Sequence, residues 1–185
     1  LKGSEFHQLV RNIQQINKDD GLTLLEEKLA QIKNQNLIKP NHPKRILLTG
    51  SDLDDTNFIE FLEDQGFYII IDDLGVGTKY FWDTVDEIGD PIENLAKYHL
   101  SKPIHSVKFP SYERFKVLKK LAQSYNVDGV INVAQKFCEP VLYDHPFLSK
   151  KFKELGIPYL FVELTYNRES YKQLTTRFSA FAEII

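Results

Sequence analysis

The sequence predicts an α/β protein with a flavodoxin-like, doubly wound sheet of about four parallel strands and helices on both faces. Four short segments are apolar at almost every position instead of alternating, which is typical of strands buried on both sides. Segments with helical spacing separate them, and right-handed crossovers then restrict the topology to this arrangement. The expected strands are residues 45–50, 67–73, 129–134 and 159–164.

The expected helices occupy the intervals before, between and after these strands. Two amphipathic helices, near residues 5–17 and 23–36, precede the first strand, and Asp20-Gly21 is expected to break them. Gly66 suits the residue that follows a helix, and Asp90-Pro91 suits the start of one. Apolar spacing and these signals predict further helices at residues 55–65, 91–100, 111–125 and 146–155, and a last one from about residue 170.

Length, charge and cysteine content limit the class of protein. A chain of 185 residues can bury a substantial core, and its net charge of -3 does not favour a nucleic-acid partner. No apolar run is long enough to span a membrane, and no signal peptide is recognisable, so we expect no membrane partner. A single cysteine fits a reducing compartment, and we expect the cytoplasm.

We expect three regions along the chain. Residues 1–6 resemble a remnant of cloning, because Gly3-Ser4-Glu5-Phe6 is typical of a vector and the first residue is not Met. Residues 7–40 form a helical appendage that either packs on the following domain or belongs to another one. After a stiff proline-containing linker, residues 44–185 form the α/β domain.

The carboxyl ends of parallel strands converge on one rim, where open α/β sheets bind their ligands. Glycines there allow close approach of a ligand, and a lysine in a glycine-containing loop can pair with phosphate or carboxylate. The structural alternatives are helix caps, turns and a solvated lysine. The candidate substrate-binding residues are Gly50, Ser51, Asp72, Asp73, Lys79, Lys136 and Glu139.

Cys138, the only cysteine, follows the third expected strand. A lone cysteine is most often a small buried hydrophobic residue, and the alternative is a metal ligand or a nucleophile at the rim. The histidines show no ligand spacing, but His105 and His145 are expected in loops near the rim, where either could transfer a proton.

Several motifs resemble those of a known family. They are Lys136-Phe137-Cys138-Glu139-Pro140, Tyr143-Asp144-His145-Pro146 and Leu155-Gly156-Ile157-Pro158, with Asp72-Asp73-Leu74 and Gly77-Thr78-Lys79 upstream. Over residues 44–185 the chain resembles the carboxyl-terminal domain of the 2-hydroxyacyl-CoA dehydratase and benzoyl-CoA reductase family, as in the D-component of 2-hydroxyglutaryl-CoA dehydratase. The pentapeptide around Cys138 is the most specific of these matches.

The resemblance implies that Cys138 ligates a [4Fe-4S] cluster, in agreement with the preference of such clusters for thiolates. It also implies an acyl-CoA thioester as substrate, a homologous partner subunit and an ATP-dependent activator that donates electrons. The chain departs from the family at Gly75 and Ile104, near which many relatives carry cysteine. Either the other ligands lie in an upstream domain, or this is a degenerate member without a cluster.

Three hypotheses follow from the sequence. The chain is part of an iron–sulfur dehydratase or reductase that uses electron-transfer radical chemistry, and is inactive in isolation. Alternatively, it is a cluster-free subunit needed for assembly or substrate binding. Thirdly, it is an unrelated flavodoxin-like module that binds a small anion at the rim.

Overall fold

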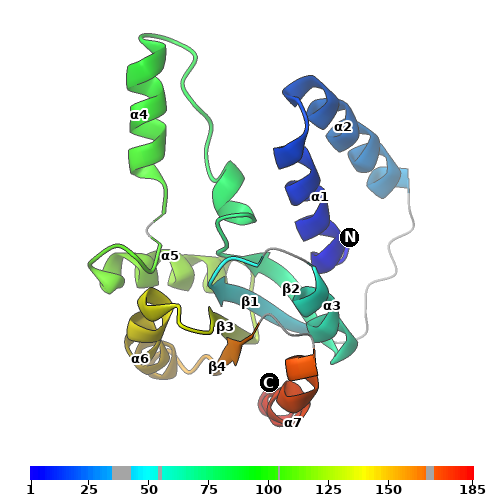
Figure 1. The fold of residues 1–185 in the computed structure, drawn as a ribbon, viewed down its shortest axis with the longest axis vertical. Helices are drawn as coiled ribbons and strands as arrows, with labels where there is room; N and C mark the ends of the chain where they lie inside the picture. The colour runs from blue at the N-terminus through cyan, green and yellow to red at the C-terminus, as the bar shows by residue number, and fades with distance from the viewer. Residues whose placement is uncertain (35–42, 54–55, 104, 166–168) are drawn as a thin grey trace.

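The computed structural model describes residues 1–34, 43–53, 56–103, 105–165 and 169–185. Its sheet contains β1 (Lys44–Gly50), β2 (Phe67–Asp72), β3 (Gly129–Gln135) and β4 (Tyr159–Leu164). All pairings are parallel, in the order β2-β1-β3-β4 (Figure 1). This confirms the doubly wound α/β fold, and the order is that of the first four strands of flavodoxin-like proteins.

Helices cover both faces of the sheet. One face packs against α3 (Asn57–Asp64) and α7 (Glu169–Ile184) through an aromatic cluster that includes Phe58, Phe67 and Phe178. The other face packs against α5 (Ser111–Ser124) and α6 (Glu139–Glu154) around Leu118, Leu148 and Phe152. Burying both faces explains why the strands carry continuous apolar runs.

Of the two amino-terminal helices, the first packs onto this domain and the second packs against the first. They are α1 (Gly3–Gln15), which contacts α3 and β2, and α2 (Lys18–Asn34). The predicted break at Asp20-Gly21 is wrong, because the chain turns earlier and α2 runs through both residues. The Asn17 side chain accepts a hydrogen bond from the Asp20 N–H and so caps the helix, while Gly21 lies against Ile13 of α1. The linker expected around residue 40 lies outside the described residues.

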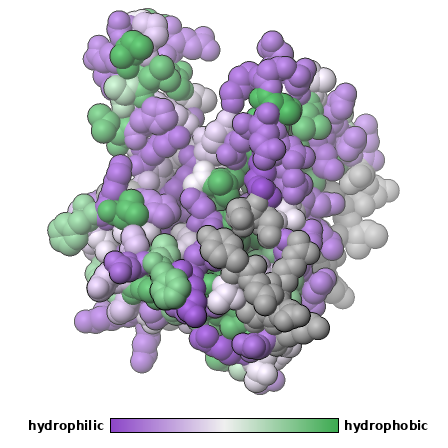
Figure 2. Space-filling model, viewed as in Figure 1, coloured by the Kyte–Doolittle hydropathy of each residue, from purple (hydrophilic) through white to green (hydrophobic). Residues whose placement is uncertain are grey.

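The segment between β2 and α5 forms an arm that projects from the sheet (Figure 1). It contains the short helix η1 (Thr78–Phe81) and α4 (Pro91–Ser101), whose start is capped by the Asp90 carboxylate at 2.8 Å from the Glu93 N–H. Apolar side chains on α4 are exposed, among them Ile92 at 74% and Leu100 at 81%. In Figure 2, green patches lie within the largely hydrophilic surface of this arm.

The helix after β3 begins earlier than predicted. Proline favours the first turn of a helix, and the sequence offers two such residues, Pro140 and Pro146. The structure begins α6 at Glu139, with Cys138 as its N-cap residue and Pro146 inside the helix. His145, expected in a loop, therefore lies on the second turn of a helix.

A β-bulge in β2 decides which way its last residues face. Ile46 pairs with Ile69, but the next residue of β1, Leu47, pairs with Ile71, so Ile70 is an additional residue in β2. Beyond the bulge, Ile71 packs on the α5/α6 face and Asp72 turns to the opposite face. The side chains of the two aspartates at the end of β2 therefore lie on opposite faces of the sheet.

Candidate functional site

Hydrogen bonds and a close backbone approach join the ends of β1 and β3 at the rim. Gly50 has φ 125°, and a Cβ there would collide with the carbonyl oxygen of Val133. The Ser51 N–H donates to that same oxygen at 2.7 Å, and the Ser51 hydroxyl accepts from the Gln135 N–H at 2.9 Å. Gly50 and Ser51 therefore join two strands at the rim, which is a structural role that leaves their backbone close to any ligand bound there.

Asp73 is the centre of a buried ionic network on the α5/α6 side of the rim. Its carboxylate lies 3.0 Å from Lys79 Nζ, 3.2 Å from Arg114 Nη2 and 3.0 Å from the Thr49 hydroxyl. Lys79 is 6% exposed, so it is not the solvated lysine that was one of the expectations from the sequence. Its ammonium group is paired with Asp73 and is not free to bind a phosphate. The pairing compensates charges that would be costly to bury alone.

Arg114 extends this network from α5 to α6. Its guanidinium pairs with Asp144 on α6 and donates to the Thr49 hydroxyl at 2.7 Å. Both Arg114 and Asp144 are almost fully buried. The network therefore connects β1, the segment after β2, α5 and α6 beneath the rim.

Asp72 lies on the opposite face, beside α1 and α3. Its Oδ1 accepts hydrogen bonds from the N–H of Leu74 at 3.0 Å and of Thr78 at 2.8 Å. Burial raises the pKa of the Asp72 carboxyl above its ordinary value, and these two hydrogen bonds only partly oppose the effect. The structure therefore separates Asp72 from the Asp73 network.

A second polar group lies between α6 and the sheet. The Tyr159 hydroxyl accepts from Asn132 Nδ2 at 2.6 Å and lies 3.2 Å from His145 Nδ1. The His145 ring stacks on Phe161 with centroids 3.9 Å apart, and burial lowers its pKa. His145 is half-buried, and its ring is positioned by these contacts with Tyr159 and Phe161.

Cys138 lies between β3 and α6, half-buried and with a free thiol. Its N–H donates to the Gln135 carbonyl at 2.8 Å, which closes a tight turn. The residue before it, Phe137, has φ 69°, a conformation that is uncommon outside glycine and concentrates at functional sites. Lys136, Phe137 and Glu139 are all exposed around the thiol. This turn presents Cys138 at the rim, at the amino-terminal end of a 16-residue helix.

The loops after β1 and β2 meet beside this rim. The Gly75 N–H donates to the Asp52 carboxylate, and a Cβ at Gly75 would lie 2.7 Å from Asp52 Oδ2. Burial lowers the pKa of His105, and the positive charges of Lys79 and Arg114 lower it further. Ile104, the other position at which relatives carry cysteine, lies outside the described residues.

The described residues contain no group of three or more histidine, cysteine or acidic side chains that could together hold a metal ion. With one cysteine in the chain, Cys138 can offer one thiolate to a [4Fe-4S] cluster, which generally takes four. The residues of this chain therefore do not fit a complete cluster.

Sequence reasoning identified the rim but missed the side chains that hold it together. It named Asp73 and Lys79, which the structure brings together, and Lys136 and Glu139, which flank Cys138. The polar residues that it missed are the buried Thr49, Arg114, Asn132 and Asp144 and the partly buried Tyr159. One signal was available: Arg114 falls among the apolar positions of an amphipathic helix, next to Phe115 and four residues before Leu118.

Comparison with known proteins now bears on this rim. The family model described as "2-hydroxyglutaryl-CoA dehydratase, D-component" matches residues 1–185. The chain belongs to this family. Among similar relatives, the "(R)-phenyllactyl-CoA dehydratase beta subunit" of Clostridium sporogenes is 29% identical over 147 residues, which are 80% of this chain and 39% of the relative.

Two further relatives carry related names. The "Lactoyl-CoA dehydratase subunit beta" of Anaerotignum propionicum is 25% identical over 185 residues, covering 97% of this chain and 48% of that protein. A benzoyl-CoA reductase subunit of Thauera aromatica is 27% identical over 146 residues, covering 76% and 38% respectively. The chain of this dehydratase family member thus spans at most about half the length of these relatives.

No helix among the residues that the structure describes combines the length and apolar character needed to cross a membrane.

Proposed function

We propose that this chain is part of a 2-hydroxyacyl-CoA dehydratase or acyl-CoA reductase subunit, and that it supplies Cys138 as one thiolate ligand of an iron–sulfur cluster. The observation that carries the proposal is the position of Cys138. The only thiol of the chain stands at the carboxyl-terminal rim of the sheet, after a left-handed Phe137 and at the start of α6. Relatives named as dehydratase and reductase subunits support the reaction class.

In this proposal the remaining cluster ligands come from outside the present chain. A cluster bound there would supply one-electron chemistry to an acyl-CoA thioester. Such an enzyme would need a homologous partner subunit and an ATP-dependent electron donor, and the relatives' designation as subunits supports the partner.

The residues of this chain would hold Cys138 in place. The Cys138 carbonyl accepts from the N–H groups of Val141 and Leu142, which joins the thiol-bearing turn to α6. Six residues further along, Asp144 joins the same helix to Arg114 and, through it, to Asp73. Removing any of these contacts would loosen α6 and move the thiol, which metal ligands tolerate poorly.

The second candidate is a cluster-free subunit of the same kind of complex. The contact between Gly75 and Asp52 favours it, because a carboxylate fills the space that a side chain at position 75 would need. In this case Cys138 is a structural residue, and the exposed apolar side chains of α4 and of Phe137 serve assembly with another subunit.

Anaerobic purification of the whole subunit, co-produced with its partner subunit, tests the proposal. We expect bound iron and sulfide with broad visible absorption, both lost in Cys138→Ser. Lys136→Gln is the matched control, because Lys136 is exposed two residues away, and it should retain the iron. Undiminished iron in Cys138→Ser refutes the role of Cys138, and iron-free wild-type protein favours the cluster-free alternative.

A further inference from the structure

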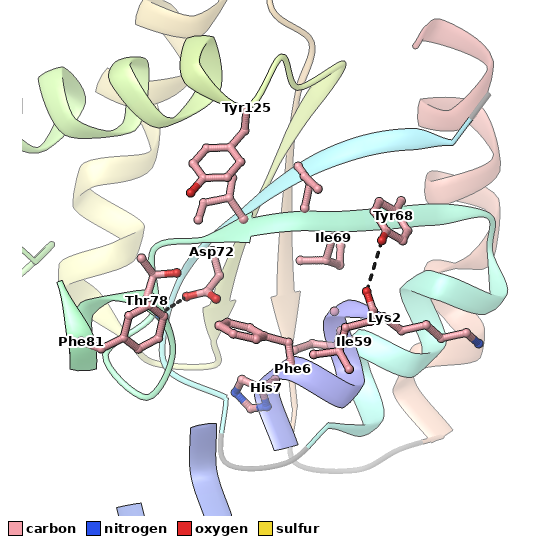
Figure 3. Close-up of a pocket in the computed structure, with 14 residues that line it drawn as sticks. Lys2, Phe6, His7, Ile59, Tyr68, Ile69, Asp72, Thr78, Phe81 and Tyr125 are labelled. Atoms are coloured by element: carbon pink, nitrogen blue, oxygen red, sulfur yellow. Dashed lines mark hydrogen bonds between the residues drawn. The ribbon is translucent and has the colours of Figure 1, made fainter. Parts of the chain in front are cut away.

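A cavity of about 270 Å³ lies between α1 and the outer edge of β2 (Figure 3). β2 is the edge strand of the sheet, so its outer side has no neighbouring strand among the described residues. Its lining comes from α1, α3, β2 and η1, together with Tyr125 at the end of α5.

Specific contacts keep the walls of this cavity in place. Ser4 on α1 donates from its N–H and its hydroxyl to the Glu63 carboxylate, at 3.1 and 2.5 Å. At the other end of the helix, Gln14 Nε2 donates to the Val76 carbonyl at 3.0 Å. A Cβ on Gly3 would lie 2.8 Å from Ile69 Cβ, so α1 is already at its closest approach to β2. The space beside it is therefore a feature of the fold and not a loosely packed gap.

Most of the wall is apolar and aromatic. Phe6 and Phe81 meet edge to face at 5.8 Å across the gap between α1 and η1. Phe81 is 46% exposed, so this aromatic pair borders the opening, while Ile59 and Ile69 form the buried floor. Such walls favour a planar apolar ligand.

One end of the cavity is polar. In Figure 3 the Asp72 carboxyl points toward Phe6 and Thr78, whereas the Lys2 side chain extends away from it. The two backbone hydrogen bonds to Asp72 both go to Oδ1. Its second oxygen, Oδ2, receives neither of them and can accept a hydrogen bond from a ligand. The bulge at Ile70 is what brings this carboxyl to the α1 side of the sheet.

We propose that this cavity binds a small uncharged aromatic compound that carries a hydroxyl or N–H donor, with the donor on Asp72. The size fits, because a cavity of roughly 150 Å³ accommodates benzene and this one has room for a ring with a short substituent. A donor pairs with the carboxyl oxygen. An anionic ligand such as a carboxylate would lose its hydration in this largely apolar space, and would also be repelled by Asp72 wherever that carboxyl is ionised, so it is rejected.

This site is independent of the proposed cluster function. The cavity follows the outer edge of β2, from Asp72 on the α1/α3 face to Ile71 and Tyr125 on the other face. Asp73, Arg114 and Cys138 do not line it. An experiment on the cavity can therefore fail while the iron-binding test succeeds, and the reverse.

Titration of the protein with phenol and with benzoate, followed by ligand-observed and protein-observed NMR, tests the proposal. The two probes share a ring and differ in charge and in the presence of a donor. We expect saturable binding of phenol at one site, with shifts in β2 and α1, and at least fivefold weaker binding of benzoate, an estimate of about one screened like-charge contact.

Two variants examine the site itself. Ile70→Phe places extra bulk at a half-buried wall position and should weaken phenol binding at least tenfold. Asp72→Asn keeps the size of the side chain and removes the ionisable group, so at a pH above the raised pKa of Asp72 the preference for phenol over benzoate should fall by about fivefold. Phe109→Ala is the control, because Phe109 is 93% exposed and does not line the cavity.

The proposal is overturned if benzoate binds the wild type as well as phenol does. It is also overturned if Ile70→Phe, shown by its NMR spectrum to be folded, binds phenol normally, or if Phe109→Ala weakens phenol as much as Ile70→Phe. Absence of saturable phenol binding to the wild type overturns it directly.

Discussion

Replacing Arg114 with methionine should destabilise the protein strongly, because Arg114 neutralises two buried carboxylates. Asp144 has no other charged partner among the described residues, whereas Asp73 keeps Lys79 at 3.0 Å and the Thr49 hydroxyl. The variant therefore leaves one buried carboxylate unpaired, which costs about 3 kcal/mol, the lower end for a broken buried pair. Loss of the hydrogen bond to Thr49 adds about 1 kcal/mol.

The expected loss is thus about 4 kcal/mol of unfolding free energy, or a fall in Tm of roughly 8–16 °C for a chain of this length. Urea denaturation of the 185-residue chain, followed by circular dichroism and by the fluorescence of Trp82, the only tryptophan, measures it. Coincidence of the two probes establishes that the transition is two-state.

A double variant tests the electrostatic reason. Arg114→Met with Asp144→Leu removes both charges, so it should recover roughly 2–3 kcal/mol relative to Arg114→Met alone. Lys116→Met breaks an exposed pair with Glu113 on the same helix and should leave the midpoint unchanged. A loss below about 1 kcal/mol in Arg114→Met, or a double variant as unstable as the single one, would refute the reasoning.

Three further perturbations test the fold. Gly50→Ala should lower the free energy of unfolding by about 3 kcal/mol or more, because a positive φ is combined with a collision at Val133. Gly156→Ala, with φ 69° and open space around it, should lower it by only about 1 kcal/mol. Equal losses in urea denaturation would contradict this reasoning. Phe178→Ala should lose about 3–5 kcal/mol, because its ring is fully buried among other aromatic rings, and a loss under 1 kcal/mol would mean that the cluster repacks. Asp72 has a raised pKa in the folded state, so its favourable contribution is complete below about pH 4, the unfolded value, and is lost as pH rises through the folded value. The free energy of unfolding of Asp72→Asn, relative to that of the wild type, should therefore be higher at pH 8 than at pH 4 when both are measured by urea denaturation. An equal difference at the two pH values would exclude the raised pKa of Asp72.

Much of the fold could be predicted because each strand is buried on both faces. Residues 46–48 and 130–134 are almost fully buried, and their runs of apolar residues, interrupted only by Asn132, follow directly from that environment. Helix boundaries were predicted less well where two signals competed. Asp20-Gly21 and Pro146 favour helix ends, but Gly21 packs against α1, and the helix after β3 begins at Glu139 with Pro140 in its first turn.

The candidate site could be predicted only in outline. The rim and Cys138 follow from the rule that strand ends converge, but the charged groups beneath the rim do not. Arg114 and Asp144 are separated by 30 residues, and Arg114 and Asp73 by 41. The position of Arg114 among apolar residues indicates that it is buried but does not identify its partners, and Asp144 precedes the helix that the sequence predicts. Only the packing of α5 against α6 encloses the pair.

By itself, the sequence determined the class of fold, the segments that form the sheet and the place of Cys138 at the end of a buried strand, because burial on both faces leaves a local apolar pattern. The tertiary structure decided which side chains work together. The bulge at Ile70 sends Asp72 into a cavity on one face and Asp73 into an ionic network on the other. That choice depends on how β2 pairs with β1, a long-range register that no local pattern in the chain encodes.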